Sequence, residues 1–222
     1  MAIQQQFNSE EGRPEILRNI SISGLNLKSE ETQKKSDEFK IFEREMAFVD
    51  LETTGLDERV HEIIEIGVVV ADQNTLEIKE EWQARIMPEF PERSNKLNRE
   101  INGFDEQEWQ GEPHLRDIIN TFAVKLNRRE LWSWNIQFEW RFLKTAFQNY
   151  NMDIHTVLGD YHGFDVIPLA KEELRRQNIA DIRFSLSNVS DALGLPIEPY
   201  PHRAMNGARK AFEVYSTVRK LS

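Results

Sequence analysis

One segment constrains the fold of this chain more than any other: AFVDLETTGLDERVHEIIEIGVVVAD, residues 47–72. It opens with a short apolar run that ends in two acids, Asp50 and Glu52, and it closes with an apolar, largely β-branched run, EIIEIGVVVAD. Short runs that are apolar on both faces are typical of strands in the centre of a sheet. The segment therefore predicts two neighbouring central strands, with a pair of carboxylates where the first strand ends.

The acid pair indicates a cation, because alternation along a strand puts Asp50 and Glu52 on the same face. Two carboxylates held side by side repel each other unless a cation lies between them. Oxygen ligands of this kind suit Mg²⁺ or Mn²⁺ rather than zinc. The glycine in the TTGL loop that follows lets backbone N–H groups approach a ligand. An Asp-x-Glu sequence taken by itself is more often a solvated surface feature, so the prediction of a cation site depends on the rest of the chain.

The remaining pattern predicts an α/β domain in which helices pack against a mixed sheet. Predicted strands cover residues 45–52, 62–72, 75–88 and 130–134; predicted helices fall within residues 91–104, 113–127, 136–150, 163–178, 185–196 and 203–221. Residues 1–43 are polar and mixed in charge, and we interpret them as an N-terminal extension with one exposed helix over residues 27–39. The domain proper is predicted to cover residues 44–222.

Composition excludes several classes of protein. The chain has no cysteine, which rules out disulfides and thiolate metal sites. It has no apolar run near the ~20 residues of a membrane helix and no apolar core of a signal peptide, so we expect a cytoplasmic protein that does not bind membranes.

Charge is unevenly distributed along the chain. The net charge of −10 argues against nonspecific coating of nucleic acid. Residues 43–108 hold 18 acids against 7 Lys/Arg, whereas residues 201–222 hold 5 Lys/Arg against 1 acid. An acidic half with a basic C-terminal helix suits a metal site that also holds a phosphate, and Arg203 and Lys210 are candidate phosphate contacts. Ordinary solvated faces are the alternative interpretation.

Three segments resemble one known family. FVDLETTGLD followed by EIIEIGVVV resembles the first motif of the DEDD 3′–5′ exonucleases, in the branch that uses a histidine and includes the proofreading subunit of bacterial DNA polymerase III, ribonuclease T and oligoribonuclease. SWNIQFEWRFL resembles the second motif, with Asn135 and Phe138 matching, and PHRAMNGARKAFEVY resembles the third, with His202 in the histidine position. The resemblance runs from about residue 43 to the C-terminus and implies a ribonuclease H-like fold, a mixed β-sheet flanked by helices.

Two of the four family acids are altered. The second-motif aspartate is Glu139, which keeps the charge on a longer side chain, and the third-motif aspartate, five residues after His202, is Gly207. By the resemblance, Asp50 would bridge two Mg²⁺ or Mn²⁺ ions, Glu52 would bind metal and the terminal 3′ hydroxyl, Glu139 would support the second ion through water, and His202 would be the general base. With no carboxylate at Gly207, one ion would be weakly bound or absent.

The candidate substrate contacts lie in the loops around these acids. Leu56, Asn102 and Phe104 are positioned to touch the terminal base and sugar, with ordinary loop packing as the alternative. Thr53 belongs to the same loop. Asn135 is expected to bond backbone near the metal loop.

Two functions remain open from sequence. The first is a metal-dependent 3′–5′ exonuclease, with reduced activity, that hydrolyses single-stranded DNA or RNA from the 3′ end. The second is a catalytically inactive relative that binds nucleic acid or a protein partner through the same cleft. Gly207 favours the second, whereas the retained Asp50, Glu52, Glu139 and His202 favour the first; an engineered glycine is a further alternative. The resemblance also allows a homodimer, since many family members are dimers.

Overall fold

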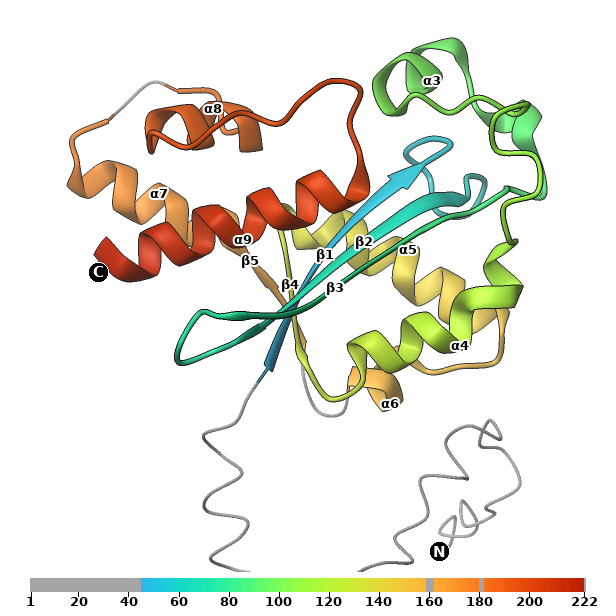
Figure 1. The fold of residues 1–222 in the computed structure, drawn as a ribbon, viewed down its shortest axis with the longest axis horizontal. Helices are drawn as coiled ribbons and strands as arrows, with labels where there is room; N and C mark the ends of the chain where they lie inside the picture. Colours follow the sequence, from blue (N-terminus) through green and yellow to red (C-terminus); the bar gives the residue numbers. More distant parts are fainter. Residues whose placement is uncertain (1–44, 159–161, 180–181, 222) are drawn as a thin grey trace, which may run out of the picture. The chain divides into compact units, whose positions relative to one another are not determined.

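One five-stranded mixed sheet organises the molecule (Figure 1). The computed structural model describes residues 45–158, 162–179 and 182–221. The strand order is β3-β2-β1-β4-β5. The strands are β1 (Glu45–Thr53), β2 (Ile63–Asp72), β3 (Ile78–Arg85), β4 (Glu130–Ser133) and β5 (Gly163–Asp165). β1 and β3 are antiparallel to β2, whereas β1, β4 and β5 run parallel to one another. The predicted fold class, a mixed sheet flanked by helices, is confirmed; the proposed extension over residues 1–43 lies outside the described residues.

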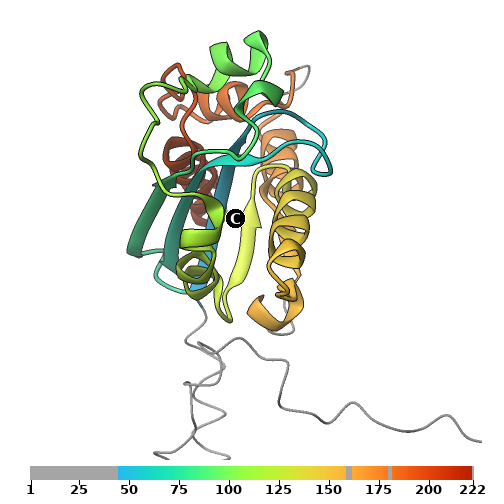
Figure 2. The ribbon, with the colours of Figure 1, turned by 90° about the vertical axis from the view of Figure 1, so that its right-hand side faces the viewer.

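Helices cover both faces of the sheet (Figures 1 and 2). They are η2 (Pro91–Arg93), α3 (Lys96–Asn102), α4 (Leu115–Leu126), α5 (Ile136–Asn149), α6 (Ile154–Leu158), α7 (Val166–Arg176), α8 (Leu186–Ala192) and α9 (Ala204–Leu221). Helices α4, α5 and α6 share one apolar core with the sheet, and α7, α8 and α9 share the other. Among the described helices, none is both long enough and apolar enough to cross a membrane.

Two elements differ from the sequence prediction. Residues 163–165 form the edge strand β5, although the pattern placed them at the start of a helix. Three residues are too few for a periodic signal, and the boundary is set by Asp165, whose side chain accepts the Ile167 N–H and so caps α7. The short helix α6 was not predicted for the same reason of length.

The alternation of β1 decides where its acids point. Ala47, Val49 and Leu51 belong to the core under α4 and α5, and Met46 and Phe48 belong to the core under α9. Asp50 and Glu52 continue the second face, because successive strand residues point to opposite sides. Both carboxylates therefore lie on the face that α9 covers, beyond the apolar residues.

A glycine lets α9 approach this end of β1. Gly67 of β2 pairs with Asp50 in the antiparallel register. A Cβ at Gly67 would lie 2.3 Å from the backbone C and O atoms of Ala204, the first residue of α9. The helix therefore rests directly on the strand, and its first two turns reach the acid pair.

Candidate active site

Carboxylates from three strand ends meet at one edge of the sheet. β1, β4 and β5 are parallel, so their C-terminal ends lie at the same edge, which is where open α/β sheets bind ligands. Asp50 and Glu52 lie at the end of β1, and Asp165 lies at the end of β5. Glu139 is buried in the first turn of α5, the helix that follows β4. Elements far apart in sequence thus supply the predicted acids to one site.

Burial and mutual repulsion raise the pKa values of these acids. The pKa of Glu52 is raised to about 8, chiefly by burial and further by repulsion from Glu198 and Glu65, with Arg203 acting against the shift. Burial also raises the pKa of Asp50 well above its usual range, with Glu139 and Glu52 as the next causes. Neighbouring carboxylates that raise one another's pKa need a proton or a cation among them.

Glu139 shows the same behaviour. Its pKa is raised to about 8, chiefly by burial; hydrogen bonds from its own backbone and from the Ser133 hydroxyl act against the shift, and repulsion from Asp165 and Glu52 adds to it. Its Oε2 atom is buried and has no hydrogen-bond partner. A buried carboxylate oxygen without a donor is costly in a protein interior and is the kind of atom that a cation satisfies.

The chemistry of these side chains fits a hard divalent cation, although their present spacing does not chelate one. Oxygen ligands from Asp50, Glu52 and Glu139 match the preference of Mg²⁺ and Mn²⁺. Across residues 45–158, 162–179 and 182–221, no group of three or more His, Cys, Asp and Glu side chains is arranged to hold a metal ion. Binding would therefore require these carboxylates to turn toward one another, and their assignment as metal ligands stays a prediction.

Gly207 lies directly against Asp50. A Cβ at Gly207 would lie 2.4 Å from Oδ2 and 2.5 Å from Cγ of Asp50. Residue 207 is the position at which the family resemblance expects a metal-binding aspartate. In this chain the Asp50 carboxylate fills the space that a side chain at residue 207 would take.

His202 is held from two sides. Its backbone N–H donates to the Ile101 carbonyl oxygen at 2.9 Å. Its Nδ1 lies 3.2 Å from Oε2 of Glu198, an acid whose charge also acts on Asp50 and Glu52. Glu198, which the sequence analysis missed, therefore lies beside the predicted general base and acts electrostatically on the predicted acid pair.

The predicted substrate contacts divide into one exposed side chain and several buried ones. Leu56 is 74% exposed in the loop after β1. Asn102 is 2% exposed; it donates to the Thr53 carbonyl oxygen and accepts from the Phe104 N–H, both at 3.0 Å. Phe104 is 3% exposed and packs edge-on against Trp109. Thr53 is buried, and its hydroxyl donates to the Gly55 carbonyl oxygen. Of these, only Leu56 presents its side chain to solvent here, and the others shape the loop around it.

Asn135 connects the C-terminal ends of β4 and β5. It adopts the left-handed conformation, with φ 65°, immediately before α5. Its backbone N–H donates to Oδ1 of Asp165 at 3.2 Å, and the same oxygen caps α7. Asparagine tolerates this backbone region better than most residues. Asn135 thus turns the chain so that Glu139 enters the site.

Three charged residues of the site were not predicted, and only Glu65 carries a recognisable signal in the sequence. Glu65 is a single acid inside the apolar run of β2, and it pairs with Glu52 in the strand register. Glu198 precedes His202 by four residues, a spacing that has no meaning in a loop until the loop is folded. Asp165 looked like a helix residue.

The predicted phosphate contacts are already engaged. Arg203 donates to the Asn102 carbonyl oxygen at 3.0 Å and lies 3.6 Å from Oε2 of Glu65. Lys210 is buried and pairs with Glu213 of the same helix. Arg203 stays near the acids, whereas the ammonium group of Lys210 is committed to its own helix.

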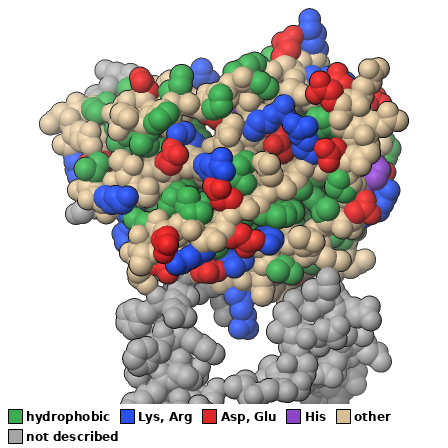
Figure 3. Space-filling view, in the orientation of Figure 1, with side chains coloured by type: hydrophobic (Ala, Val, Ile, Leu, Met, Phe, Trp, Pro, Cys, Tyr) green, Lys and Arg blue, Asp and Glu red, His purple; other side chains and the backbone are tan. Residues whose placement is uncertain are grey.

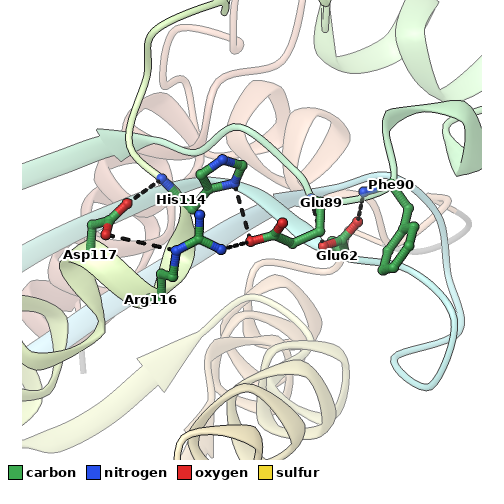
Figure 4. Close-up of polar contacts among 6 residues, drawn as sticks. All are labelled: Glu62, Glu89, Phe90, His114, Arg116 and Asp117. Atoms are coloured by element: carbon green, nitrogen blue, oxygen red, sulfur yellow. Dashed lines mark hydrogen bonds and ion pairs between the residues drawn. The ribbon is translucent and has the colours of Figure 1, made fainter.

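A polar network fixes the loops that flank the site (Figure 4). The carboxylate of Glu62 accepts the backbone N–H groups of Glu89 and Phe90 at 2.9 and 2.8 Å. Glu89 in turn pairs with Arg116 and lies 3.4 Å from Nδ1 of His114, at the start of α4. The β1–β2 loop, the segment leading to α3, and α4 are therefore tied together by side chains.

An open depression of about 940 Å³ is lined by residues of β2, β3, α4 and α9; Glu65 and Arg203 belong to its lining, whereas Asp50, Glu52, Glu139 and His202 do not. Its charged and polar lining includes Glu65, Glu81, Arg85, Arg203, Asn206 and Arg209. The face drawn in Figure 3 likewise mixes positive, negative and apolar side chains. A strand of nucleic acid on such a surface would meet individual arginines rather than a continuous basic stripe.

Comparisons with known proteins show the family of this chain. A family model described as exonuclease matches residues 47–215. The PolC-type DNA polymerase III of Thermotoga petrophila is 31% identical over 173 residues, which are 75% of this chain and 11% of that protein. The 3′–5′ exonuclease DinG of Staphylococcus haemolyticus is 26% identical over 158 residues, which are 71% of this chain and 16% of that protein. The chain thus spans a small part of these relatives.

Solved structures share the fold. Exonuclease I of E. coli in complex with a dA16 oligonucleotide superposes with a TM-score of 0.67 at 16% identity, covering 80% of this chain and 41% of that one. A 3′-exonuclease that recognises the 3′ end of a histone mRNA stem-loop superposes with a TM-score of 0.61 at 16% identity, covering 86% and 70%. With the family match extending over most of the described domain, the chain belongs to the DEDD-type 3′–5′ exonuclease family.

Proposed function

We propose that this domain is a divalent-cation-dependent exonuclease that removes nucleotides from the 3′ end of single-stranded DNA or RNA. The observation that carries the proposal is the meeting of Asp50, Glu52 and Glu139 at one sheet edge, where Glu52 raises the pKa of both Asp50 and Glu139, and Glu139 raises the pKa of Asp50. Such a cluster is unfavourable in a protein without a cation, and divalent ions are general in this family. The matched relatives are nucleic-acid enzymes, one of them named a 3′–5′ exonuclease.

Each residue has a role in this proposal. When bound, a divalent cation lowers the pKa of a water and neutralises the leaving 3′ oxygen. Asp50 and Glu52 would hold it directly, and Glu139 would reach it at the edge of the cluster. His202 would take the proton of the attacking water at its imidazole, a side chain whose ring nitrogens can both accept and release a proton.

The substrate-binding proposal centres on the exposed side chain. Leu56 would contact the terminal base, since apolar side chains beside a hydrolytic site hold an unpaired base by stacking and burial. Thr53, Asn102, Phe104 and Asn135 would maintain the loops that place Leu56 and Glu139. Leu56→Ala is then expected to raise KM more than it lowers kcat.

An inactive nucleic-acid-binding relative is the second candidate function, and one observation favours it. Gly207 has no side chain, so the cation-binding arrangement is short of one carboxylate. The Asp50 carboxylate occupies the space next to Gly207. Mg²⁺ retains several waters readily, so one more can take the place of a ligand. The expected consequence is a lower rate; each ~1.4 kcal/mol lost from transition-state stabilisation is tenfold in kcat.

The deciding experiment follows 5′-labelled single-stranded DNA and RNA in Mn²⁺ and in Mg²⁺. The parent protein is expected to give a ladder of products shortened from the 3′ end, and Glu52→Gln is expected to give none. Glu77→Gln is the matched control, since Glu77 is an exposed acid in the turn at the opposite end of β2, paired with Lys79. Its ladder should equal that of the parent.

Two results count against the enzyme. A parent protein that leaves both substrates intact but retains them in a binding assay supports the inactive relative. A Glu52→Gln protein that degrades as fast as the parent places the chemistry elsewhere. The relative rates on the two substrates decide between DNA and RNA; the cytoplasmic location and the homodimer stay predictions.

A further inference from the structure

Glu198 has a buried carboxylate placed beside the ring of His202. Its side chain is 5% exposed, whereas that of His202 is 41% exposed. Oε2 of Glu198 lies 3.2 Å from Nδ1 of His202, and Oε1 accepts the backbone N–H of Arg203 at 3.4 Å. Both carboxylate oxygens therefore face the third-motif segment.

This acid is placed where it costs electrostatic free energy. Its charge repels both Asp50 and Glu52. A buried carboxylate in acidic surroundings usually has a compensating partner, because an unpaired buried charge is strongly destabilising. Among the side chains within reach, the imidazole of His202 is the partner that the geometry provides.

The pairing has a chemical consequence. A neutral imidazole has one N–H and one lone pair, and the hydrogen bond made by one nitrogen decides the state of the other. An ionised carboxylate only accepts hydrogen bonds, so it favours the tautomer with the hydrogen on Nδ1. The lone pair is then on Nε2, where it can take a proton from water.

We propose that Glu198 is a positioning residue for His202: its carboxylate accepts the Nδ1–H, orients the ring and leaves Nε2 free to act as the base. The proposal rests on the exonuclease function proposed above. A competing role, in which Glu198 replaces the carboxylate missing at Gly207 as a metal ligand, fits the contacts less well. Both oxygens of Glu198 already have partners in the third-motif segment.

The first test reads the tautomer and does not need activity. Two-bond ¹H–¹⁵N spectra of chelator-treated protein labelled at histidine report which ring nitrogen carries the hydrogen, and the His202 signals are assigned by their loss in His202→Asn. The parent should carry it on Nδ1. In Glu198→Gln the amide can donate to Nδ1, so the hydrogen should shift to Nε2.

The control for charge is Glu65→Gln. Glu65 also repels Asp50 and Glu52, but its partner is Arg203. This variant should keep the parent tautomer. A His202 tautomer that is the same in the parent and in Glu198→Gln would overturn the proposal.

The second test reads the rate at saturating substrate and saturating Mn²⁺. Loss of general-base catalysis lowers rates by roughly 10²–10⁴-fold, so Glu198→Gln should lower kcat by about 10²-fold with little change in KM. Glu198→Asp, which keeps the carboxylate, should recover part of the rate. Thermal melting of each variant shows whether a loss of rate comes from a folding defect. A Glu198→Gln protein that is slow at low Mn²⁺ but reaches the kcat of the parent once Mn²⁺ is saturating would identify a metal ligand and overturn the positioning role.

A double-mutant comparison separates positioning from packing. In a His202→Asn protein, adding Glu198→Gln should lower the residual rate no further, because residues that act as a unit are not additive. Additive losses would overturn the proposal. If the parent itself degrades nothing, the exonuclease function fails; an active parent whose Glu198→Gln variant keeps its kcat refutes only the role of Glu198.

Discussion

A single methyl group at Gly207 would probe the contact between α9 and the acid pair. The Cβ of Gly207→Ala would lie 2.4 Å from Oδ2 of Asp50, whereas ordinary van der Waals contacts to a Cβ fall at 3.4–4 Å. The carboxylate must therefore retreat by about 1 Å or more. Asp50 is a short side chain on a central strand, so it can move this far only by rotating about χ1.

The magnitude follows from two opposing effects. In a helix interior, glycine is about 1 kcal/mol less favourable than alanine, so Gly→Ala ordinarily stabilises by that amount. Forcing a side chain away from its preferred rotamer costs of order 0.5–1.5 kcal/mol. The free energy of unfolding of Gly207→Ala should therefore change by about zero or decrease, and cleavage should slow because Asp50 is displaced.

Urea unfolding in chelator, followed by circular dichroism, measures the stability, and the oligonucleotide ladder measures the rate. Asn206→Ala is the matched control, since it changes the neighbouring residue of the same helix turn and should be stabilised modestly by helix propensity. If Gly207→Ala gains the full ~1 kcal/mol of a solvent-exposed helix site and cleaves as fast as the parent, Asp50 does not lie against α9 as described. Gly207→Asp should restore a family carboxylate only if Asp50 rotates in the same way.

Three further predictions concern stability. Glu52 and Glu139 have folded pKa values of about 8 against ordinary values of 4.5, so the stability that they contribute in the protonated form is complete below pH 4.5 and is lost as pH rises through 8. Chelated protein should thus melt at progressively lower temperature between pH 5 and 8.5, and Mn²⁺ should reduce the loss; a flat or rising profile in chelator contradicts this electrostatic account. Gly67→Ala should destabilise by about 1–3 kcal/mol, because its Cβ would meet the α9 backbone, which cannot rotate away; unchanged denaturant unfolding would show that α9 does not rest on β2. Asn102→Ala should cost about 2 kcal/mol and increase hydrogen exchange at Thr53–Gly55, because it removes a donor and an acceptor from buried backbone partners. Asn102→Asp, which keeps the acceptor but sets a buried carboxylate oxygen against the Thr53 carbonyl oxygen, should cost at least as much; unchanged unfolding in both variants would contradict these hydrogen bonds.

Local pattern was enough for the framework of the fold. The apolar runs of β1 and β2 are signals that a strand carries in its own residues, and the period of two placed Asp50 and Glu52 on one face without knowledge of any neighbour. The helical spacing that predicted α5 and α9 is local in the same way. The short β5 and α6 escaped because three to five residues cannot establish a period.

The composition of the cluster depended on how the elements pack. The loop before α9 folds over the sheet edge, and this brings Glu198 to His202 and Arg203 to Glu65. No spacing in the sequence encodes such contacts. Asn102 and Phe104 looked like surface contacts from their position in a loop, yet the loop folds inward and buries both.

The sequence by itself determined that a carboxylate is missing at Gly207, because the identity of a residue requires no structure. Only the tertiary structure decided what fills its place. Gly67 lets α9 lie on β2, and this close approach brings Gly207 against the Asp50 carboxylate. Residue types and periods are properties of neighbours along the chain, whereas an approach of helix to strand so close that a Cβ at Gly207 would lie 2.4 Å from Asp50 Oδ2 is set by the packing of the whole sheet.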